Sequence, residues 1–198
     1  MTVHIRHANA IFLLWDAKSM FAIEPSAVSK SNMMASPERM LIPVAAFSSA
    51  FLAGGMNLVS MIAVPMILKT TPPDSSLLLR QWHFIYSSGH KVGPKLAVAS
   101  GLLYWTAAWT TQERGKTIAL YAYSGALTMS MVPFTWLFIV RINNAIFAEI
   151  EKNRAGTPTN LADAQYLVGR WRKLNIARTV FPILGAALGL ITLSGLVR

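Results

Sequence analysis

The sequence has no cysteine and few charged residues. None of its 198 residues is Cys, so disulfide bonds and thiolate chemistry are excluded and the redox state of the compartment leaves no mark on the sequence. Asp, Glu, Lys and Arg together make up 13% of the chain, whereas soluble domains carry about a quarter. Hydrophobic residues make up 54%, and they are concentrated in long apolar runs. This composition favours a single integral membrane domain.

The few charges are mostly positive. There are 18 Lys and Arg against 8 Asp and Glu, which gives a formal net charge of +10. Nucleic-acid-binding proteins gather such cations on one solvated face. Here the cations flank the apolar runs, as they do beside lipid headgroups. We therefore predict contact with membrane lipid and no nucleic-acid partner.

The apolar runs predict the fold class. A membrane-spanning helix needs about 20 predominantly apolar residues. We expect an all-α protein: an integral membrane four-helix bundle with short amphipathic helices in its two large loops. The expected spans are about 41–68, 93–109, 117–142 and 177–197. Small and polar side chains recur at helical spacing from Ser49 to Ser60, and Gly185 and Gly189 form a second small-residue contact, so these faces should pack against other helices.

The N-terminal segment, residues 1–40, differs from the membrane domain, residues 41–198. Its apolar stretch Ala8–Trp15 is too short to span a bilayer, so we expect this segment to be poorly ordered or amphipathic. A cleaved signal peptide is the alternative, but Asp16 ends the apolar stretch early. A further hypothesis is that translation starts at Met34.

The stretch Thr70–Ala97 gathers polar and aromatic residues between the first two spans. Asp74 can cap a helix over residues 75–88, and Gly89 can end it. A hydrophobic chain that places several of its few ionisable groups in one loop is expected to use that loop.

Two histidines in this loop, His83 and His90, are candidate bases. Histidine titrates near neutral pH and therefore suits proton abstraction. Arg80 lies three residues before His83, close enough for the two to serve one ligand. The alternative is that Trp82 and Tyr86 are interfacial anchors and that Arg80 contacts lipid phosphate.

The second large polar loop, residues 143–175, leads into the last span. The candidate binding residues on this side are Trp136, Asn143, Trp171, Asn175 and Arg178. The last three recur at i, i+4 and i+7, so they share one face if the helix is continuous. Arg178 lies at the membrane edge, where an unpaired cation is costly.

Other chemistries have little support. His83 and His90 with Asp74, Glu149 or Asp163 could supply two imidazoles and a carboxylate to a metal, but their spacing matches no tight motif and we expect no metal. There is no Gly-rich phosphate loop after a strand and no GxSxG sequence, so nucleotide cofactors and serine-hydrolase chemistry have no local support.

Several segments carry a resemblance to a known family. They are RQWHFIYSSGHKVGPKLA in the first loop, GRWRKLNIARTVFPILGAALGL in the last helix, FLAGGMNLVSMIAVP and FTWLFIVRINNAI. Over about residues 40–197 the chain resembles the anthrone oxygenases, small four-span membrane proteins of fungal polyketide pathways. The resemblance implies oxidation of an anthrone to an anthraquinone with molecular oxygen, without flavin, haem or metal. It also implies an aromatic polyketide substrate and a location in the endoplasmic reticulum or another endomembrane.

Such a reaction needs a base, a donor to the developing oxyanion and a dry aromatic pocket. We assign His83 as the preferred base and His90 as the second choice. The candidate donors are Arg80, Arg178, Asn143 and Asn175, and the candidate stacking residues are Trp82, Tyr86, Trp136 and Trp171. The side with the two large loops carries more Lys and Arg than the side with the termini, which places the loops in the cytosol.

Two other classes of function are kept as alternatives. A transporter would carry ionisable groups in the middle of its spans, and the first three spans have none. A non-catalytic scaffold that docks a soluble pathway enzyme is the main alternative. The remaining partner alternatives are a second copy of this chain and a pathway enzyme.

Overall fold

The computed structural model describes residues 36–111 and 115–196, and within these ranges all regular structure is helical. The expectations for residues 1–35 lie outside the described residues. The helices are α2 (Pro37–Leu58), η2 (Val59–Ala63), α3 (Val64–Thr70), α4 (Ser75–Gly89), α5 (Val92–Thr110), α6 (Lys116–Phe134), η3 (Thr135–Ile139), α7 (Val140–Arg154) and α8 (Leu161–Leu193), where η denotes a π-helical turn. The first helix therefore begins at Pro37 rather than at Leu41.

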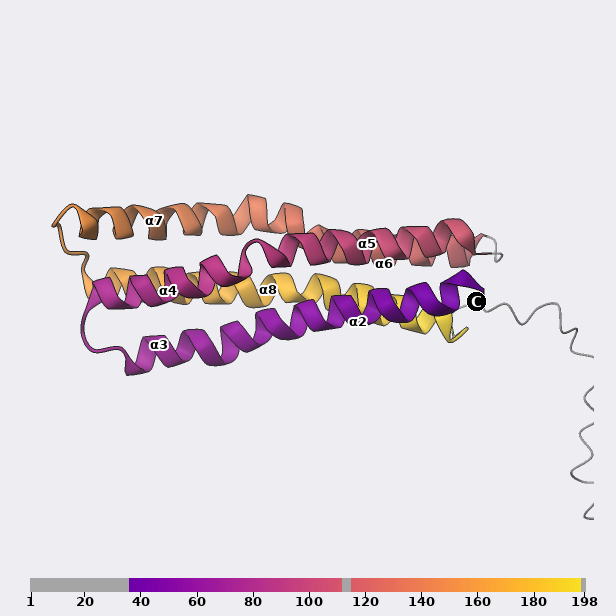
Figure 1. Cartoon of the computed structure of the whole chain (residues 1–198), viewed down its shortest axis with the longest axis horizontal. Helices are drawn as coiled ribbons and strands as arrows, with labels where there is room; N and C mark the ends of the chain where they lie inside the picture. The colour runs from indigo at the N-terminus through magenta and orange to yellow at the C-terminus, as the bar shows by residue number, and fades with distance from the viewer. Residues whose placement is uncertain (1–35, 112–114, 197–198) are drawn as a thin grey trace, which may run out of the picture. The chain divides into compact units, whose positions relative to one another are not determined.

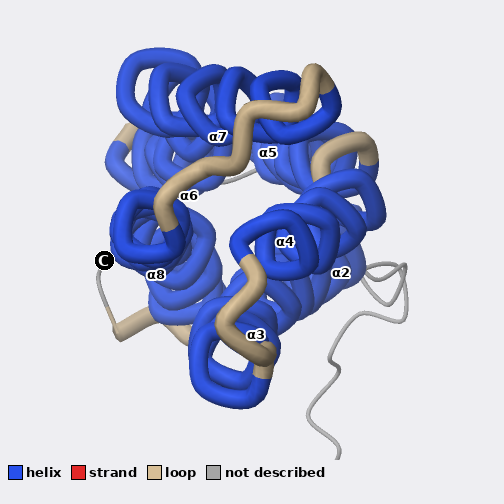
Figure 2. The backbone as a smooth tube through the Cα atoms, turned by 90° about the vertical axis from the view of Figure 1, so that its left-hand side faces the viewer, coloured by secondary structure: helices blue, strands red, loops and turns tan. Residues whose placement is uncertain are grey.

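Four long helices form a bundle (Figure 1). α2 packs against α5 and α8, and α6 packs against the same two helices, so the four form a closed ring. Figure 2 shows the helices arranged around a common axis. The predicted all-α four-helix bundle is confirmed.

The bundle is longer than the predicted spans. α2 continues through η2 into α3, and α6 continues through η3 into α7. α4 is a separate helix that packs against α3, α7 and α8. The prediction of a short amphipathic helix in each large loop is right for α4 and wrong for the second loop. Residues 134–154 contain no Gly or Pro, so the helix continues to Arg154. Asn160 then caps α8, which runs unbroken for 33 residues.

Length and composition identify candidate membrane spans among these helices. Three helices of the described chain are long and apolar enough to cross a membrane: 37–70, 116–154 and 161–193. The predicted second span is helix α5, of 19 residues, which is not one of these three. Gly93, Pro94 and Lys95 occupy its first turn and lower its hydropathy. α5 is nevertheless one side of the ring, between α2 and α6.

The start of α4 has the predicted cap. The Asp74 side chain accepts hydrogen bonds from the backbone N–H groups of Ser76 (2.8 Å) and Leu77 (3.2 Å). The Ser76 hydroxyl, together with these backbone donors, holds the pKa of the exposed Asp74 carboxyl below its usual value. α4 ends at Gly89, and His90 follows it as the C-terminal cap residue. His90 therefore stands at the junction between α4 and α5.

The small residues of α8 permit close helix packing, as predicted. A Cβ atom on Gly185 would lie 2.2 Å from the Thr128 hydroxyl oxygen and 2.7 Å from the Ser124 carbonyl oxygen of α6. One on Gly189 would lie 2.5 Å from a ring carbon of Tyr104 on α5. Both positions therefore require glycine in this packing.

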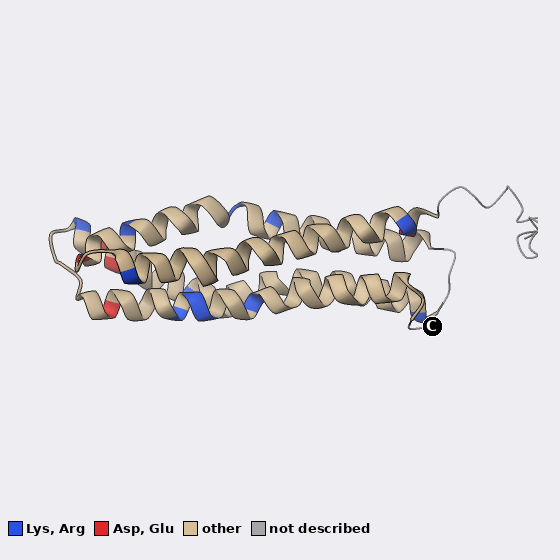
Figure 3. Cartoon of the chain, turned by 90° about the horizontal axis from the view of Figure 1, so that it is seen from below, with Lys and Arg blue, Asp and Glu red and all other residues tan. Residues whose placement is uncertain are grey.

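Charged and apolar side chains are separated along the bundle. Lys, Arg, Asp and Glu gather near the α3–α4–α7 end and at the opposite tip, with a charge-free length between (Figure 3). Exposed apolar side chains such as Phe47, Leu58 and Leu137 cover the outside of the bundle. This is the surface expected for a protein in contact with lipid. The structure thus supports a membrane protein.

Candidate active site

A cavity of about 470 Å³ lies beside the break between α4 and α5. Its lining comes from four parts of the chain: α2 between Phe51 and Val59, the α4–α5 junction between Ile85 and Leu96, η3 and α7 between Thr135 and Asn143, and α8 between Trp171 and Arg178. Small-molecule sites typically enclose about 300–1,000 Å³. Both π-helical turns contribute to the lining, and such turns are frequent at functional sites.

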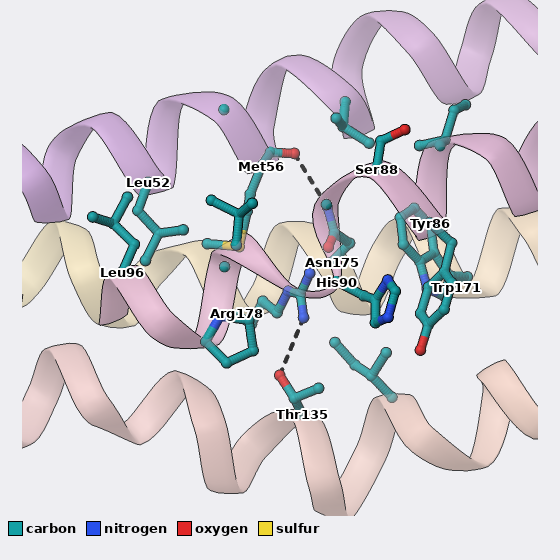
Figure 4. Close-up of a pocket in the computed structure, with 18 of the residues that line it drawn as sticks. Leu52, Met56, Tyr86, Ser88, His90, Leu96, Thr135, Trp171, Asn175 and Arg178 are labelled. Atoms are coloured by element: carbon teal, nitrogen blue, oxygen red, sulfur yellow. Dashed lines mark hydrogen bonds between the residues drawn. The ribbon is translucent and has the colours of Figure 1, made fainter. Parts of the chain in front are cut away.

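One face of α8 supplies the polar wall, as its spacing predicted. Trp171, Asn175 and Arg178 all line the cavity (Figure 4). The Asn175 amide nitrogen donates to the Met56 carbonyl oxygen at 3.1 Å and to the Ser60 hydroxyl at 2.6 Å. These bonds join α8 to α2 at the start of its π-helical turn.

The Arg178 guanidinium is anchored on the other side of the cavity. Its Nη1 donates to the Thr135 hydroxyl oxygen at 3.1 Å, in the π-helical turn η3. Arg178 Nε is buried and has no hydrogen-bond partner. Arg178 is therefore held in position and retains an N–H group for a ligand.

Three further lining residues hold a buried polar atom without a partner. These are the Trp171 indole nitrogen, the Asn175 amide oxygen and the Asn143 amide oxygen. A carbonyl oxygen only accepts, so the bond to Met56 fixes the nitrogen side of Asn175 and leaves its oxygen as the free acceptor. Buried polar atoms are normally paired. Residues that line the cavity thus contain two N–H donors and two amide-oxygen acceptors that are unpaired within the protein.

Aromatic rings form a column along α4 that ends at the cavity. The rings of Trp82 and Tyr86 stack at 5.2 Å between centroids and 18° between planes. Those of Tyr86 and His90 stack at 4.8 Å and 7°. Trp82 also meets Trp171 edge to face at 5.8 Å, which joins the column to the α8 wall. Tyr86 and His90 line the cavity themselves.

The hydrogen bond of His90 favours one form of its ring. Its Nδ1 lies 3.1 Å from the Ser87 carbonyl oxygen. Because a carbonyl can only accept, Nδ1 is the protonated nitrogen in this contact. The Nε2 atom of neutral His90 then carries a lone pair. His90 therefore brings an unprotonated nitrogen to a cavity that also holds hydrogen-bond donors.

Six of the ten residues singled out in the sequence line the cavity: Tyr86, His90, Asn143, Trp171, Asn175 and Arg178. Trp82 is fully buried behind Tyr86. His83 is half-buried and meets Phe147 edge to face at 5.8 Å, outside the lining. The structure therefore brings His90 to the cavity rather than the preferred His83.

Two other expected residues point elsewhere. Arg80 is exposed on α4, and the Trp136 side chain is 74% exposed on the outside of the bundle. Trp136 and Asn143 are seven residues apart, the spacing of one helix face, but Trp136 lies inside the π-helical turn η3, which shifts that register.

Thr135 and Met56 were not assigned to the site from sequence. Thr135 anchors Arg178, and the Met56 carbonyl anchors Asn175. Pro133, two residues before Thr135, was a signal for the first, because a proline inside a helix removes a backbone hydrogen bond and kinks the helix nearby. The small-residue face of α2 gave a signal for the second.

The lining contains one imidazole and no carboxylate among the described residues. In the described part of the chain, no three of His, Cys, Asp and Glu lie together as a metal site would need. The carboxylates considered in the sequence, Asp74, Glu149 and Asp163, are not among the lining residues. The ligand set available at the cavity is therefore a poor match for a divalent metal.

Comparison with known proteins points to one family. The sequence profile of the anthrone oxygenase family matches residues 82–188. A monooxygenase, hypC, of Dothistroma septosporum is 40% identical over 152 residues, which cover 77% of this chain and 80% of that protein. A noranthrone monooxygenase of Aspergillus flavus is 36% identical over 156 residues, covering 78% and 74%. The anthrone oxygenase AgnL2 of Paecilomyces divaricatus is 38% identical over 148 residues, covering 73% and 90%. No solved structure matches the chain.

The profile match includes the second half of α4, the α4–α5 junction and most of α8, and therefore includes His90, Trp171, Asn175 and Arg178. The similarity covers most of this chain and most of each of these relatives, so it is not confined to one motif. The chain is an oxygenase and belongs to the anthrone oxygenase family.

Proposed function

We propose that this enzyme oxidises a hydroxylated anthrone, a planar aromatic polyketide, to the corresponding anthraquinone with molecular oxygen. The observation that carries the proposal is the composition of the cavity. One imidazole nitrogen is free to accept a proton, two buried N–H groups are free to donate, and aromatic rings form the walls. The names of the relatives, anthrone oxygenase and noranthrone monooxygenase, support this substrate class.

His90 is the base in this proposal. The methylene C–H of an anthrone is acidic because its loss gives an aromatic, delocalised phenolate. Nε2 of His90 takes this proton, while the Nδ1 contact with the Ser87 carbonyl keeps the ring oriented. General-base catalysis of this kind contributes about 10²–10⁴-fold to a rate.

Arg178 and Trp171 stabilise the negative charge that the base creates. The charge of the carbanion is delocalised onto the ketone oxygen of the anthrone, which then accepts from Arg178 Nε and the Trp171 indole N–H. Both donors are already fixed, Arg178 through Thr135 and Trp171 through its contact with Trp82. Donors that are positioned before the reaction stabilise developing charge without reorganisation.

The oxygen chemistry balances without an added reductant. The carbanion transfers its electrons to O2, and a carbon–oxygen bond forms to give a peroxide anion. This anion takes a proton from His90. The remaining C–H proton then leaves, the O–O bond breaks, and the products are the quinone carbonyl and water. One anthrone and one O2 thus give one anthraquinone and one water, and His90 returns to its neutral form.

The two amide oxygens orient the substrate. Asn175 Oδ1 and Asn143 Oδ1 lack partners inside the protein, and the phenolic hydroxyls of a polyketide anthrone are donors that fit them. A site with buried acceptors discriminates against analogues that lack the hydroxyl. We therefore expect faster oxidation of hydroxylated anthrones than of unsubstituted anthrone.

No organic cofactor or resident metal is part of the proposal, and O2 is the co-substrate. The test is oxidation of a hydroxylated anthrone in air by membranes that contain the enzyme, followed by quinone absorbance. Membranes without the enzyme are the control, because anthrones also oxidise spontaneously. We expect a rate well above this control that survives a metal chelator. A rate equal to the control refutes the proposal, and loss of activity with the chelator refutes its cofactor-free form.

We also propose that the enzyme resides in an endomembrane with the α3–α4–α7 end in the cytosol. More Lys and Arg lie at this end than at the other in the described chain (Figure 3), and cytoplasmic segments carry an excess of these residues. An apolar polycyclic substrate concentrates in the bilayer, where this enzyme would meet it.

A further inference from the structure

The cavity is closed on three sides and open on one. Its lining residues on α8, η3 and α7 are all buried or half-buried. Its exposed lining residues are Phe51, Gly55, Ser88, Gly89, His90 and Val92. All of these lie on α2 or at the α4–α5 junction, so the mouth of the cavity lies between these two parts of the chain.

The rim of the mouth on α2 is apolar. The side chain of Phe51 is 67% exposed there, and α2 and α3 carry no charged residue between Arg39 and Lys69. Gly55 lies near the middle of this uncharged run, and Leu58, one turn further along, is 60% exposed. A helix surface of this kind faces hydrocarbon rather than water.

The rim on the α4–α5 side is mixed. Val92 is 61% exposed, whereas Lys91 and Lys95 beside it are exposed cations of the kind that contact lipid headgroups. The mouth therefore spans the boundary between hydrocarbon and headgroups. A planar aromatic molecule with phenolic hydroxyls settles at this same boundary, with its rings in hydrocarbon and its hydroxyls toward water.

We propose that the aromatic substrate enters sideways from the bilayer, through a mouth between α2 and the α4–α5 junction that Gly55 keeps open. This inference rests on the proposed function for the identity of the substrate. Gly55 lines the cavity and is exposed, and a Cβ atom there would meet no other atom within 4 Å. A Cβ atom at this position therefore fits without strain on the fold, and we expect a larger side chain built on it to occupy the opening.

The neighbouring glycine provides a matched control. Gly54 is also exposed on α2, and a Cβ atom there also meets nothing within 4 Å, but Gly54 is not among the cavity-lining residues. Gly55→Phe and Gly54→Phe lie in the same helix and change the hydrophobicity of the chain by the same amount. We expect Gly55→Phe to lower kcat/KM for the anthrone at least tenfold and Gly54→Phe to change it less than twofold. Equal effects of the two substitutions overturn the proposal.

A second measurement needs no turnover. The chain has no cysteine, so Gly55→Cys and Gly54→Cys each introduce a single thiol that a maleimide can label. We expect an anthraquinone at saturating concentration to slow labelling of Gly55→Cys at least fivefold and that of Gly54→Cys less than twofold. Equal slowing at both positions, or none at either, refutes the mouth. Protection at Gly55→Cys in an enzyme that makes no quinone supports the mouth and refutes the proposed function instead.

The same thiols show whether the route starts in lipid or in water. The reference is Thr157→Cys, in the exposed link between α7 and α8. For each variant, the labelling rate with a membrane-soluble maleimide is divided by the rate with a charged maleimide. We expect this ratio to be at least tenfold higher for Gly55→Cys than for Thr157→Cys. Equal ratios mean that the mouth opens to water and overturn the lipid route.

Discussion

At the scale of single residues, the site depends on the break after Gly89. His83 lies within α4, three residues from Arg80, and was the preferred base in the sequence. The cavity, however, lies at the end of α4 rather than along its side, so the stacked column reaches it through Tyr86 and His90. Periodicity describes positions within a helix. It says nothing about the direction of the chain after the helix ends.

Arg178 is predicted to act through its planar, two-ended guanidinium. Nη1 is bound to Thr135 while Nε is free, and the single ammonium of lysine cannot serve both partners in this geometry. We expect Arg178→Lys to lower kcat about 10²-fold, the scale for loss of one oxyanion donor, with a smaller change in KM. Arg170→Lys, at an exposed position of the same helix, is the control. A kcat within a few-fold of wild type for Arg178→Lys would remove Arg178 from the mechanism.

Asn175 is predicted to stabilise the fold as well as bind substrate. Its amide nitrogen donates to the Met56 carbonyl and the Ser60 hydroxyl, and a carboxylate in its place would have no N–H to donate. Loss of such buried hydrogen bonds costs about 1–3 kcal/mol. We expect Asn175→Asp to lower the thermal unfolding midpoint in detergent, measured by tryptophan fluorescence. The exposed Asn144→Asp should unfold as wild type does, and equal midpoints for the two variants would contradict this role.

At the scale of helices, sequence patterns predicted the packing faces well and the helix ends poorly. Gly185 and Gly189, and the buried Ser49 and Ser60, all face neighbouring helices as their spacing indicated. The length of α8 was missed because its first half is polar and its second half apolar. Composition predicts a loop helix for the first half and a membrane span for the second, but the two halves form one continuous helix.

We predict that Gly185 sets the distance between α6 and α8. A Cβ atom there would lie 2.2 Å from Thr128 Oγ1, so Gly185→Leu forces the helices apart. Overpacking costs about 1–3 kcal/mol, and we expect a lower unfolding midpoint. Gly169→Ala in the same helix meets nothing within 4 Å and should be neutral or stabilising by about 0.5–1 kcal/mol. The packing account fails if Gly185→Leu is as stable as Gly169→Ala.

The two π-helical turns could not have been located from sequence alone. Pro65 and Pro133 lie close to the two turns in the sequence, but prolines are compatible with kinks as well as with π turns. In the structure, Arg172 Nε donates to the Ser60 carbonyl oxygen of η2 at 2.7 Å, and Arg178 Nη1 donates to the Thr135 hydroxyl oxygen of η3. The turns therefore widen two helices at the level where polar side chains of α8 reach them.

At the scale of the whole molecule, the charge distribution predicts the orientation. The α3–α4–α7 end should face the cytosol. We expect an Asn-Gly-Thr acceptor inserted after Gly156, in the link between α7 and α8, to stay unglycosylated in microsomes. The same link should be cleaved by protease added from the cytosolic side. Glycosylation together with protection from protease would reverse the orientation.

His90 is the proposed base of an anthrone oxidation in a membrane-embedded cavity. The most direct test compares His90→Gln with His83→Gln in membranes supplied with a hydroxylated anthrone in air. Both variants remove an imidazole from the same 15-residue helix or its cap, but only His90 lines the cavity. The account predicts that His90→Gln lowers the enzyme-dependent rate of quinone formation at least 10²-fold, while His83→Gln stays within a few-fold of wild type. The reverse pattern, or two variants as active as wild type, would contradict it.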